Sequence, residues 1–109
     1  MDLLSGRPDP PRILNKASER PGKNVTVRWT RTQERNCEIT MYSLRYRVVK
    51  PTTRDWVEIN ITDVNSYKLH LQYSKKYNVT MFAWNNLGRS KESEAWEIRT
   101  AQCKKIPLP

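Results

Sequence analysis

The sequence has few residues suited to catalysis: it contains one histidine and two cysteines in 109 residues. His70 lies between two leucines whose alternation points them inward, so the histidine itself is expected to face solvent and not to serve as a triad base. A single histidine also cannot form a His-rich metal site. The carboxylate pair Glu92 and Glu94 falls in a predicted turn rather than in a cleft. We therefore expect no enzyme activity, no metal and no cofactor.

Long apolar runs are also missing. No segment approaches the roughly 20 apolar residues that cross a bilayer, and residues 1–6 lack the apolar core of a signal peptide. With only 3 glycines and 7 prolines, the chain is not of a fibrous or low-complexity type. We expect one domain over residues 8–101, with 1–7 as a linker or residues added for expression and 102–109 as a C-terminal linker. Targeting and membrane-anchoring segments are expected elsewhere in a longer parent chain.

Acidic residues are in the minority. Twenty lysines and arginines against 11 acidic residues give a formal net charge of +9, which attracts polyanions. The basic residues are scattered, however, and no glycine-rich loop, zinc spacing or basic helix accompanies them, so nucleic-acid binding is not expected. A solvated basic surface is the favoured interpretation. The alternative is a heparan sulfate site near the loop tips, formed by Lys75, Lys76, Arg89 and Lys91.

Alternation of apolar and polar residues is the strongest positive signal. In residues 77–84, one side carries Tyr77, Val79, Met81 and Ala83, and the other carries Asn78, Thr80, Phe82 and Trp84. This period of two predicts a strand with two different faces. Residues 85–88 tolerate positive φ, so a hairpin should follow.

The same alternation predicts further strands at 12–17, 24–30, 39–49, 56–62, 66–71 and 93–100, and no segment has a helical period. The inward side chains should be Val25, Val27, Trp29, Tyr42, Leu44, Tyr46, Val48, Tyr67, Leu69, Leu71, Trp96 and Ile98, whereas Ser43, Arg45, Arg47 and Val49 should point outward. Seven short strands with turns between them indicate an all-β sandwich.

Leu71 and Tyr77 have the spacing of a tyrosine corner, in which a buried phenol bonds back to the preceding loop. Together with the strand that follows and with Asn85, Gly88 and Ser90, they resemble the E to G region of a fibronectin type III domain. The resemblance covers roughly residues 8–100. It implies a seven-stranded antiparallel Ig-like β-sandwich, with strands A, B and E packed against C, C′, F and G.

Two segments suggest a subfamily. Residues 42–47 followed by 55–59 are similar to the C to C′ region of class I cytokine receptors, and residues 85–103 look like membrane-proximal modules of the tall signal-transducing members. The Trp-Ser-x-Trp-Ser signature and the cysteine quartet of the group are missing. The resemblance implies a rigid extracellular spacer and interaction module in a single-pass cell-surface receptor, with other receptor modules or a protein ligand as partners. The alternative is a module of an adhesion receptor, a receptor phosphatase or a matrix protein.

Three Asn-x-Thr sequons begin at Asn24, Asn60 and Asn78, and alternation places each asparagine on the outward side of its strand. Chance occurrence is the alternative, but in a secreted protein each could accept an N-linked sugar. The three sequons therefore predict an extracellular glycoprotein.

Cys37 and Cys103 are expected at opposite poles of the sandwich, since the strands that lead to them run in opposite directions. Strands of about seven residues separate the poles by more than roughly 20 Å, whereas a disulfide needs Cα atoms within about 7 Å. No disulfide within the domain is predicted.

The outward face of the second sheet should gather arginines and aromatic rings that can stack guanidinium over ring. The stack would stiffen the sheet, which is the favoured interpretation, or bind a partner. The predicted members are Arg45, Arg47, Trp56, Phe82 and Trp84.

Overall fold

The computed structural model describes residues 6–15, 22–30, 38–49 and 55–102, and these residues form strands and no helix. Accordingly, no helix within these ranges is long and apolar enough to span a membrane. The strands are β1 (Asn24–Arg28), β2 (Met41–Val48), β3 (Val57–Ile61), β4 (Ser66–His70), β5 (Lys76–Asn85), β6 (Gly88–Arg89) and β7 (Trp96–Arg99).

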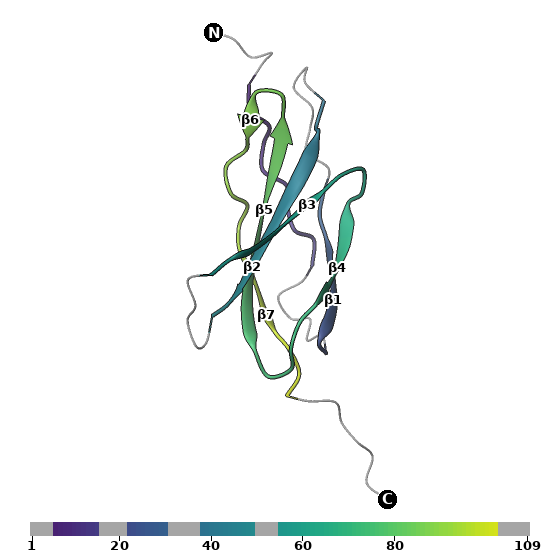
Figure 1. The fold of residues 1–109 in the computed structure, drawn as a ribbon, viewed down its shortest axis with the longest axis vertical. Helices are drawn as coiled ribbons and strands as arrows, with labels where there is room; N and C mark the ends of the chain where they lie inside the picture. Colours follow the sequence, from purple (N-terminus) through teal and green to yellow (C-terminus); the bar gives the residue numbers. More distant parts are fainter. Residues whose placement is uncertain (1–5, 16–21, 31–37, 50–54, 103–109) are drawn as a thin grey trace, which may run out of the picture.

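The strands form two antiparallel sheets that face each other (Figure 1). One sheet pairs β1 with β4, and the other has the order β3-β2-β5-β6, with β7 also paired to β5. The all-β antiparallel sandwich is confirmed, and six of the seven predicted strands lie in the predicted sheets: B and E in one, and C, C′, F and G in the other.

The predicted edge strand at 12–17 is wrong in its described part, which forms only an isolated bridge between Ile13 and Trp29. The side chain of Asn15 takes over the next pairing position: its Nδ2 donates to the Thr26 carbonyl at 2.9 Å, and its Oδ1 accepts from the Arg28 amide at 2.8 Å. The side-chain amide of Asn15 thus makes the two hydrogen bonds that a backbone peptide of an edge strand would make. This edge of β1 is therefore paired, although residues 12–15 are not a regular strand.

The core lies between the sheets and is built from the inward sides of the strands. Trp29 and Tyr42 contact each other from opposite sheets, with ring centroids 5.7 Å apart. The alternation is confirmed for the buried residues Val25, Val27, Trp29, Tyr42, Leu44, Leu69, Leu71, Tyr77, Val79, Met81, Ala83, Trp96 and Ile98, and Tyr46 and Val48 pack partly buried against them.

Tyr67 is the exception, because its side chain is 37% exposed. Its strand β4 pairs with β1 alone among the described strands. Tyr67 lies opposite Val27 in that pair, at the edge of a two-stranded sheet. The prediction that this ring belongs to the core is therefore wrong.

The described chain starts at one end of the sandwich and finishes at the other (Figure 1). Asn85, the last residue of β5, donates from Nδ2 to the Gly6 carbonyl at 2.8 Å. Ser74, just before β5, donates its amide to the Ala101 carbonyl at 2.7 Å. Because β5 has 10 residues and a strand rises about 3.3 Å per residue, these two anchor points lie roughly 30 Å apart.

Candidate interaction face

The outer face is the side of the β3-β2-β5 sheet that is turned away from β1 and β4. Arg45 lies between Glu58 of β3 and Thr80 of β5, and Ser43 lies between Asn60 and Phe82. Side chains directly opposite one another in antiparallel strands share a face and come into contact. The register therefore brings residues of three strands together on this surface.

Guanidinium groups and aromatic rings alternate across the outer face. The Arg47 and Arg45 Cζ atoms each lie 4.6 Å from the Trp56 ring centroid, and Arg45 also lies 5.8 Å from Phe82. Arg89 continues the series, 4.2 Å from Phe82 and 5.9 Å from Trp84. We call this set the arginine ladder; its members are Arg45, Arg47, Arg89, Trp56, Phe82 and Trp84.

The ladder explains why an outward-facing phenylalanine is buried. Phe82 is only 4% exposed, although it points away from the core between the sheets. The guanidinium groups of Arg45 and Arg89 lie over its ring and shield it from water. The sequence placed Arg89 only in the heparan sulfate alternative and not in this stack. Its position follows from the hairpin, which pairs Arg89 with Trp84.

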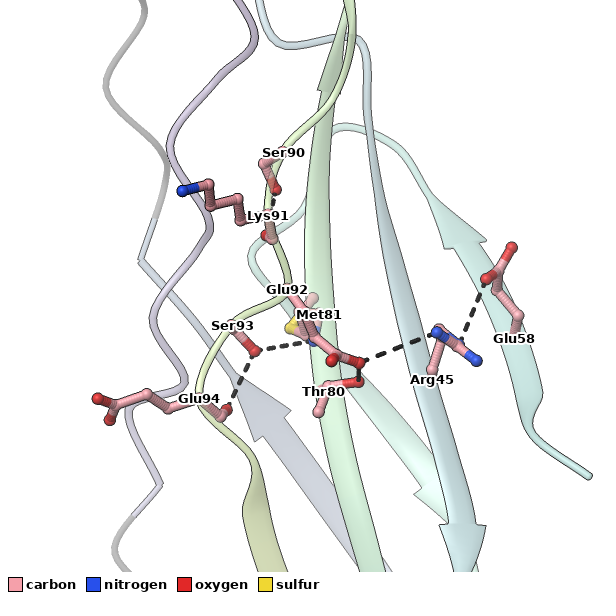
Figure 2. Close-up of polar contacts among 9 residues, drawn as sticks. All are labelled: Arg45, Glu58, Thr80, Met81, Ser90, Lys91, Glu92, Ser93 and Glu94. Atoms are coloured by element: carbon pink, nitrogen blue, oxygen red, sulfur yellow. Dashed lines mark hydrogen bonds and ion pairs between the residues drawn. The ribbon is translucent and has the colours of Figure 1, made fainter. Parts of the chain in front are cut away.

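Two carboxylates flank the middle of the ladder (Figure 2). Arg45 Nε lies 3.7 Å from Glu58, and Arg45 Nη1 lies 3.9 Å from Glu92. Thr80 donates its hydroxyl to Glu92 at 2.8 Å. Both ion pairs are partly exposed, so each contributes little stability. Their effect is to orient the Arg45 guanidinium between Trp56 and Phe82.

Two serines attach the segment between β6 and β7 to β5, and Figure 2 shows the hydrogen bond between Ser93 and Met81. Ser93 Oγ accepts the Met81 amide at 2.9 Å, and the Ser93 amide donates to the Met81 carbonyl at 2.9 Å. Ser90 makes the same pair of bonds with Ala83, at 2.9 and 2.8 Å. The two serine hydroxyl oxygens thus accept the β5 amides that the backbone carbonyls of a neighbouring strand would otherwise accept. The sequence pattern predicted Ser90 in the hairpin and Ser93 at the start of the last strand, but that strand begins only at Trp96.

A short hydrogen-bond chain ties β3 to β5 across β2. The Trp84 indole Nε1 donates to Ser43 Oγ at 2.8 Å, and Ser43 Oγ donates to Asn60 Oδ1 at 2.8 Å. Ser43 is fully buried although it points outward, because the ladder covers it. This hydrogen-bond chain places Asn60, which begins one of the three sequons, beside the arginine ladder.

The three sequon asparagines have different surroundings. Asn24 is exposed at the start of β1, and its Oδ1 lies 3.0 Å from His70 Nδ1. Asn60 is exposed on β3, whereas Asn78 is half-buried in β5 between Arg47 and Glu97 of the neighbouring strands.

Tyr77, which its spacing from Leu71 places in a tyrosine corner, hydrogen-bonds back to the segment before β5. The Tyr77 hydroxyl accepts a hydrogen bond from the Gln72 amide at 3.0 Å, directly after the buried Leu71. Tyr46 packs edge-on against Tyr77 with ring centroids 6.1 Å apart. Burial raises the pKa of the Tyr46 phenol above its ordinary value, and the neighbouring Tyr77 and Tyr67 raise it further.

The four basic residues considered for heparan sulfate fall into two pairs rather than one cluster. Lys75 precedes β5 and Lys76 begins it, with Lys76 Nζ 3.2 Å from Glu97. Arg89 lies opposite Trp84 near the other end of β5, followed by Lys91.

Cys37 and Cys103 lie outside the described residues, so the absence of a disulfide stays a prediction. Within the described ranges, no three His, Cys, Asp or Glu side chains gather as a metal site.

Two facing antiparallel sheets define a β-sandwich module of the immunoglobulin-like kind. The fibronectin type III domain family matches residues 9–99, and the chain belongs to this family.

Among relatives, the chain is 30% identical over 95 residues to Neural cell adhesion molecule L1.1 of Danio rerio, which covers 84% of this chain and 8% of that protein. It is 28% identical over 101 residues to Cell adhesion molecule DSCAML1 of Homo sapiens, covering 87% of this chain and 5% of the other. The chain thus spans less than a tenth of either relative.

Solved structures share the fold. The FN1–FN3 domains of chicken CNTN1 superpose with a TM-score of 0.68 at 22% identity, covering 88% of this chain and 34% of that one. The twitchin kinase region from C. elegans gives a TM-score of 0.73 at 18% identity, covering 94% of this chain and 18% of the other. At these identities the likeness shows the fold alone.

Proposed function

We propose that this chain is an extracellular module of a cell-surface adhesion receptor, where it holds the neighbouring parts of its parent protein at a fixed distance and angle. Two curated relatives that match most of the chain are named as cell adhesion molecules. The three sequons agree with an extracellular location. A membrane anchor would lie elsewhere in the parent.

The observation that carries the proposal is the way both ends of the described chain are fixed to β5. At one end Asn85 binds the Gly6 carbonyl through Nδ2, while its Oδ1 accepts the amides of Leu87 and Gly88 at 2.8 and 3.2 Å. At the other end the amide of Ser74 donates to Ala101. A module held in this way transmits both position and direction from one neighbour to the next.

The arginine ladder supports the spacer role in a second way. It joins β3, β2, β5 and the segment that follows β5 through stacked planar groups, which stiffens the sheet. The same face is the surface we assign to protein partners, since tryptophan and arginine are enriched in binding hot spots.

A cytokine receptor module is the second candidate, and the serine pair favours it. Ser90 and Ser93 are three residues apart, as are the serines of the Trp-Ser-x-Trp-Ser signature. Arg89 and Glu92 occupy the positions of its tryptophans, and Arg89 stacks on Phe82. A heparan sulfate role is less favoured, because its four basic residues lie in two separate pairs.

Single-molecule energy transfer across the module tests the spacer mechanism. Dyes attached at Gly6→Cys and Gln102→Cys, with Cys37 and Cys103 replaced by serine, should give one narrow distance distribution beyond roughly 30 Å. A side chain at position 6 meets no atom within 4 Å. Asn85→Ala should broaden the distribution, because Gly6 loses its anchor. A broad distribution in the parent variant would contradict a rigid spacer.

Insertion of this chain into a related adhesion molecule tests the adhesion role. This chain would replace the matching segment of Neural cell adhesion molecule L1.1, and aggregation of cells that display the chimera would be measured. We expect aggregation to be retained with this chain and to be lost when a flexible linker of equal residue number takes its place. Loss with both insertions would count against the proposed function.

A further inference from the structure

We propose that Asn60 carries an N-linked oligosaccharide that covers the arginine ladder from the β3 edge, over the Trp84 indole, so that partners reach the outer face from the opposite edge, formed by β6 and β7. The inference rests on the proposed extracellular location. Asn60, Ile61 and Thr62 form the sequon, and Asn60 and Thr62 are both exposed. Within the described sheet, β3 pairs with β2 alone, so the Asn60 edge is open.

The hydrogen-bond chain to Trp84 fixes the orientation of the Asn60 amide. An indole N–H can only donate, so Ser43 Oγ must accept from Trp84 and use its single hydrogen for Asn60. Asn60 therefore turns its oxygen toward Ser43. Asn60 Nδ2, on the other side of the planar amide, is left to carry the sugar. Glycosylation therefore leaves both hydrogen bonds, Trp84 to Ser43 and Ser43 to Asn60, intact.

The other two sequons provide the contrast. Asn24 is also exposed, but it lies on β1 in the opposite sheet, far from the ladder. Asn78 is half-buried in a central strand, and the hydroxyl of its sequon residue Thr80 is buried and donates to Glu92. We expect sugar at Asn24 and Asn60 and none at Asn78 in the secreted, folded product.

The chemistry uses a donor from the secretory pathway, an oligosaccharide joined to a lipid pyrophosphate. Asn60 Nδ2 attacks C1 of the first sugar, and the new C1–N bond replaces the C1–O bond. The lipid pyrophosphate leaves with the electron pair of that bond, and a base of the transferase takes one Nδ2 proton. The product keeps one N–H on Nδ2 and the Oδ1 acceptor for Ser43.

The four tryptophans allow the shielding of the arginine ladder by the Asn60 sugar to be measured. Trp29 and Trp96 are 0% and 5% exposed, whereas Trp56 and Trp84 are half-buried on the outer face. Quenching of tryptophan fluorescence by acrylamide therefore reports mainly on the ladder. Because Asn60 is two hydrogen bonds from Trp84, a bulky sugar there should lower the quenching constant by about half, as one of two accessible rings is covered.

The test uses the full chain secreted from mammalian cells behind a cleavable signal sequence. Enzymatic release of the sugars in heavy-oxygen water, followed by peptide mass spectrometry, identifies each modified asparagine. Thr62→Ala abolishes the Asn60 sequon without altering the Asn60 side chain, and it should restore quenching to the level of unglycosylated protein made in bacteria. Trimming the folded glycoprotein to a single sugar per site should raise quenching too, and needs no variant.

Thr26→Ala is the matched control, because it removes the Asn24 sugar from the other sheet and should leave quenching unchanged. The inference is overturned if Asn60 is unmodified, or if Thr62→Ala and trimming leave quenching as it was. It is also overturned if Thr26→Ala raises quenching as much as Thr62→Ala. A bare Asn60 beside a modified Asn24 would leave the adhesion role standing, since the chimera experiment tests that role separately.

Discussion

Replacement of Ser93 by alanine should destabilise the domain well beyond what a small polar substitution usually costs. Ser93 Oγ accepts the amide of Met81 at 2.9 Å and donates to the Glu94 carbonyl at 3.1 Å. Met81 is completely buried and Ser93 is 8% exposed. Without the hydroxyl, the Met81 amide is left in a dry site with no acceptor. The substitution removes this one oxygen and no apolar atom.

The magnitude follows from the buried amide. A buried donor that loses its acceptor costs about 1–3 kcal/mol. The Ser93 amide still donates to the Met81 carbonyl, so the segment stays attached and the loss should be about 2 kcal/mol rather than larger. For a domain of this size, roughly 4 °C of melting temperature corresponds to each kcal/mol, which gives a shift of about 8 °C.

The assay is urea and thermal unfolding followed by tryptophan fluorescence. Ser66→Ala is the matched control, because Ser66 is exposed on β4 and should change stability by no more than about 0.5 kcal/mol. If Ser93→Ala and Ser66→Ala unfold at the same midpoint, the serine hydroxyls do not replace strand carbonyls and the account of this segment is wrong.

Three further predictions address other contacts. Tyr77→Phe should lower stability by about 1 kcal/mol, since the Gln72 amide loses its acceptor but is only partly buried; the exposed Tyr67→Phe is the control, and an unchanged midpoint for Tyr77→Phe would argue against the corner. Arg89→Ala should cost about 1 kcal/mol by uncovering Phe82, and Arg89→Lys should recover only part because an ammonium lacks the planar stacking surface; full recovery would mean that charge alone matters. Thiol titration and mass spectrometry of the oxidised domain should find no bridge between Cys37 and Cys103, and detection of that bridge would refute the predicted strand directions.

The arginine ladder shows how far sequence reasoning reached at the candidate site. Alternation placed Arg45, Arg47, Phe82 and Trp84 on outward sides, and the structure brings them together with Trp56. Arg89 was assigned only to the heparan sulfate alternative and not to the ladder, since its place depends on the register of a two-residue turn between β5 and β6. The burial of the outward-facing Ser43 could not be predicted from the sequence either, because the rings and guanidinium groups that cover it belong to other strands.

The amino-acid sequence by itself determined the strand identity of most segments and the inward side of each, since the period of two is a property of the extended backbone and of local residue order. Only the tertiary structure decided which partners those strands meet. It left Tyr67 at an open sheet edge, reduced residues 12–15 to a bridge completed by Asn15, and gave Ser90 and Ser93 the place of strand carbonyls. Burial and hydrogen bonding depend on residues distant in the chain, so local pattern could not fix them.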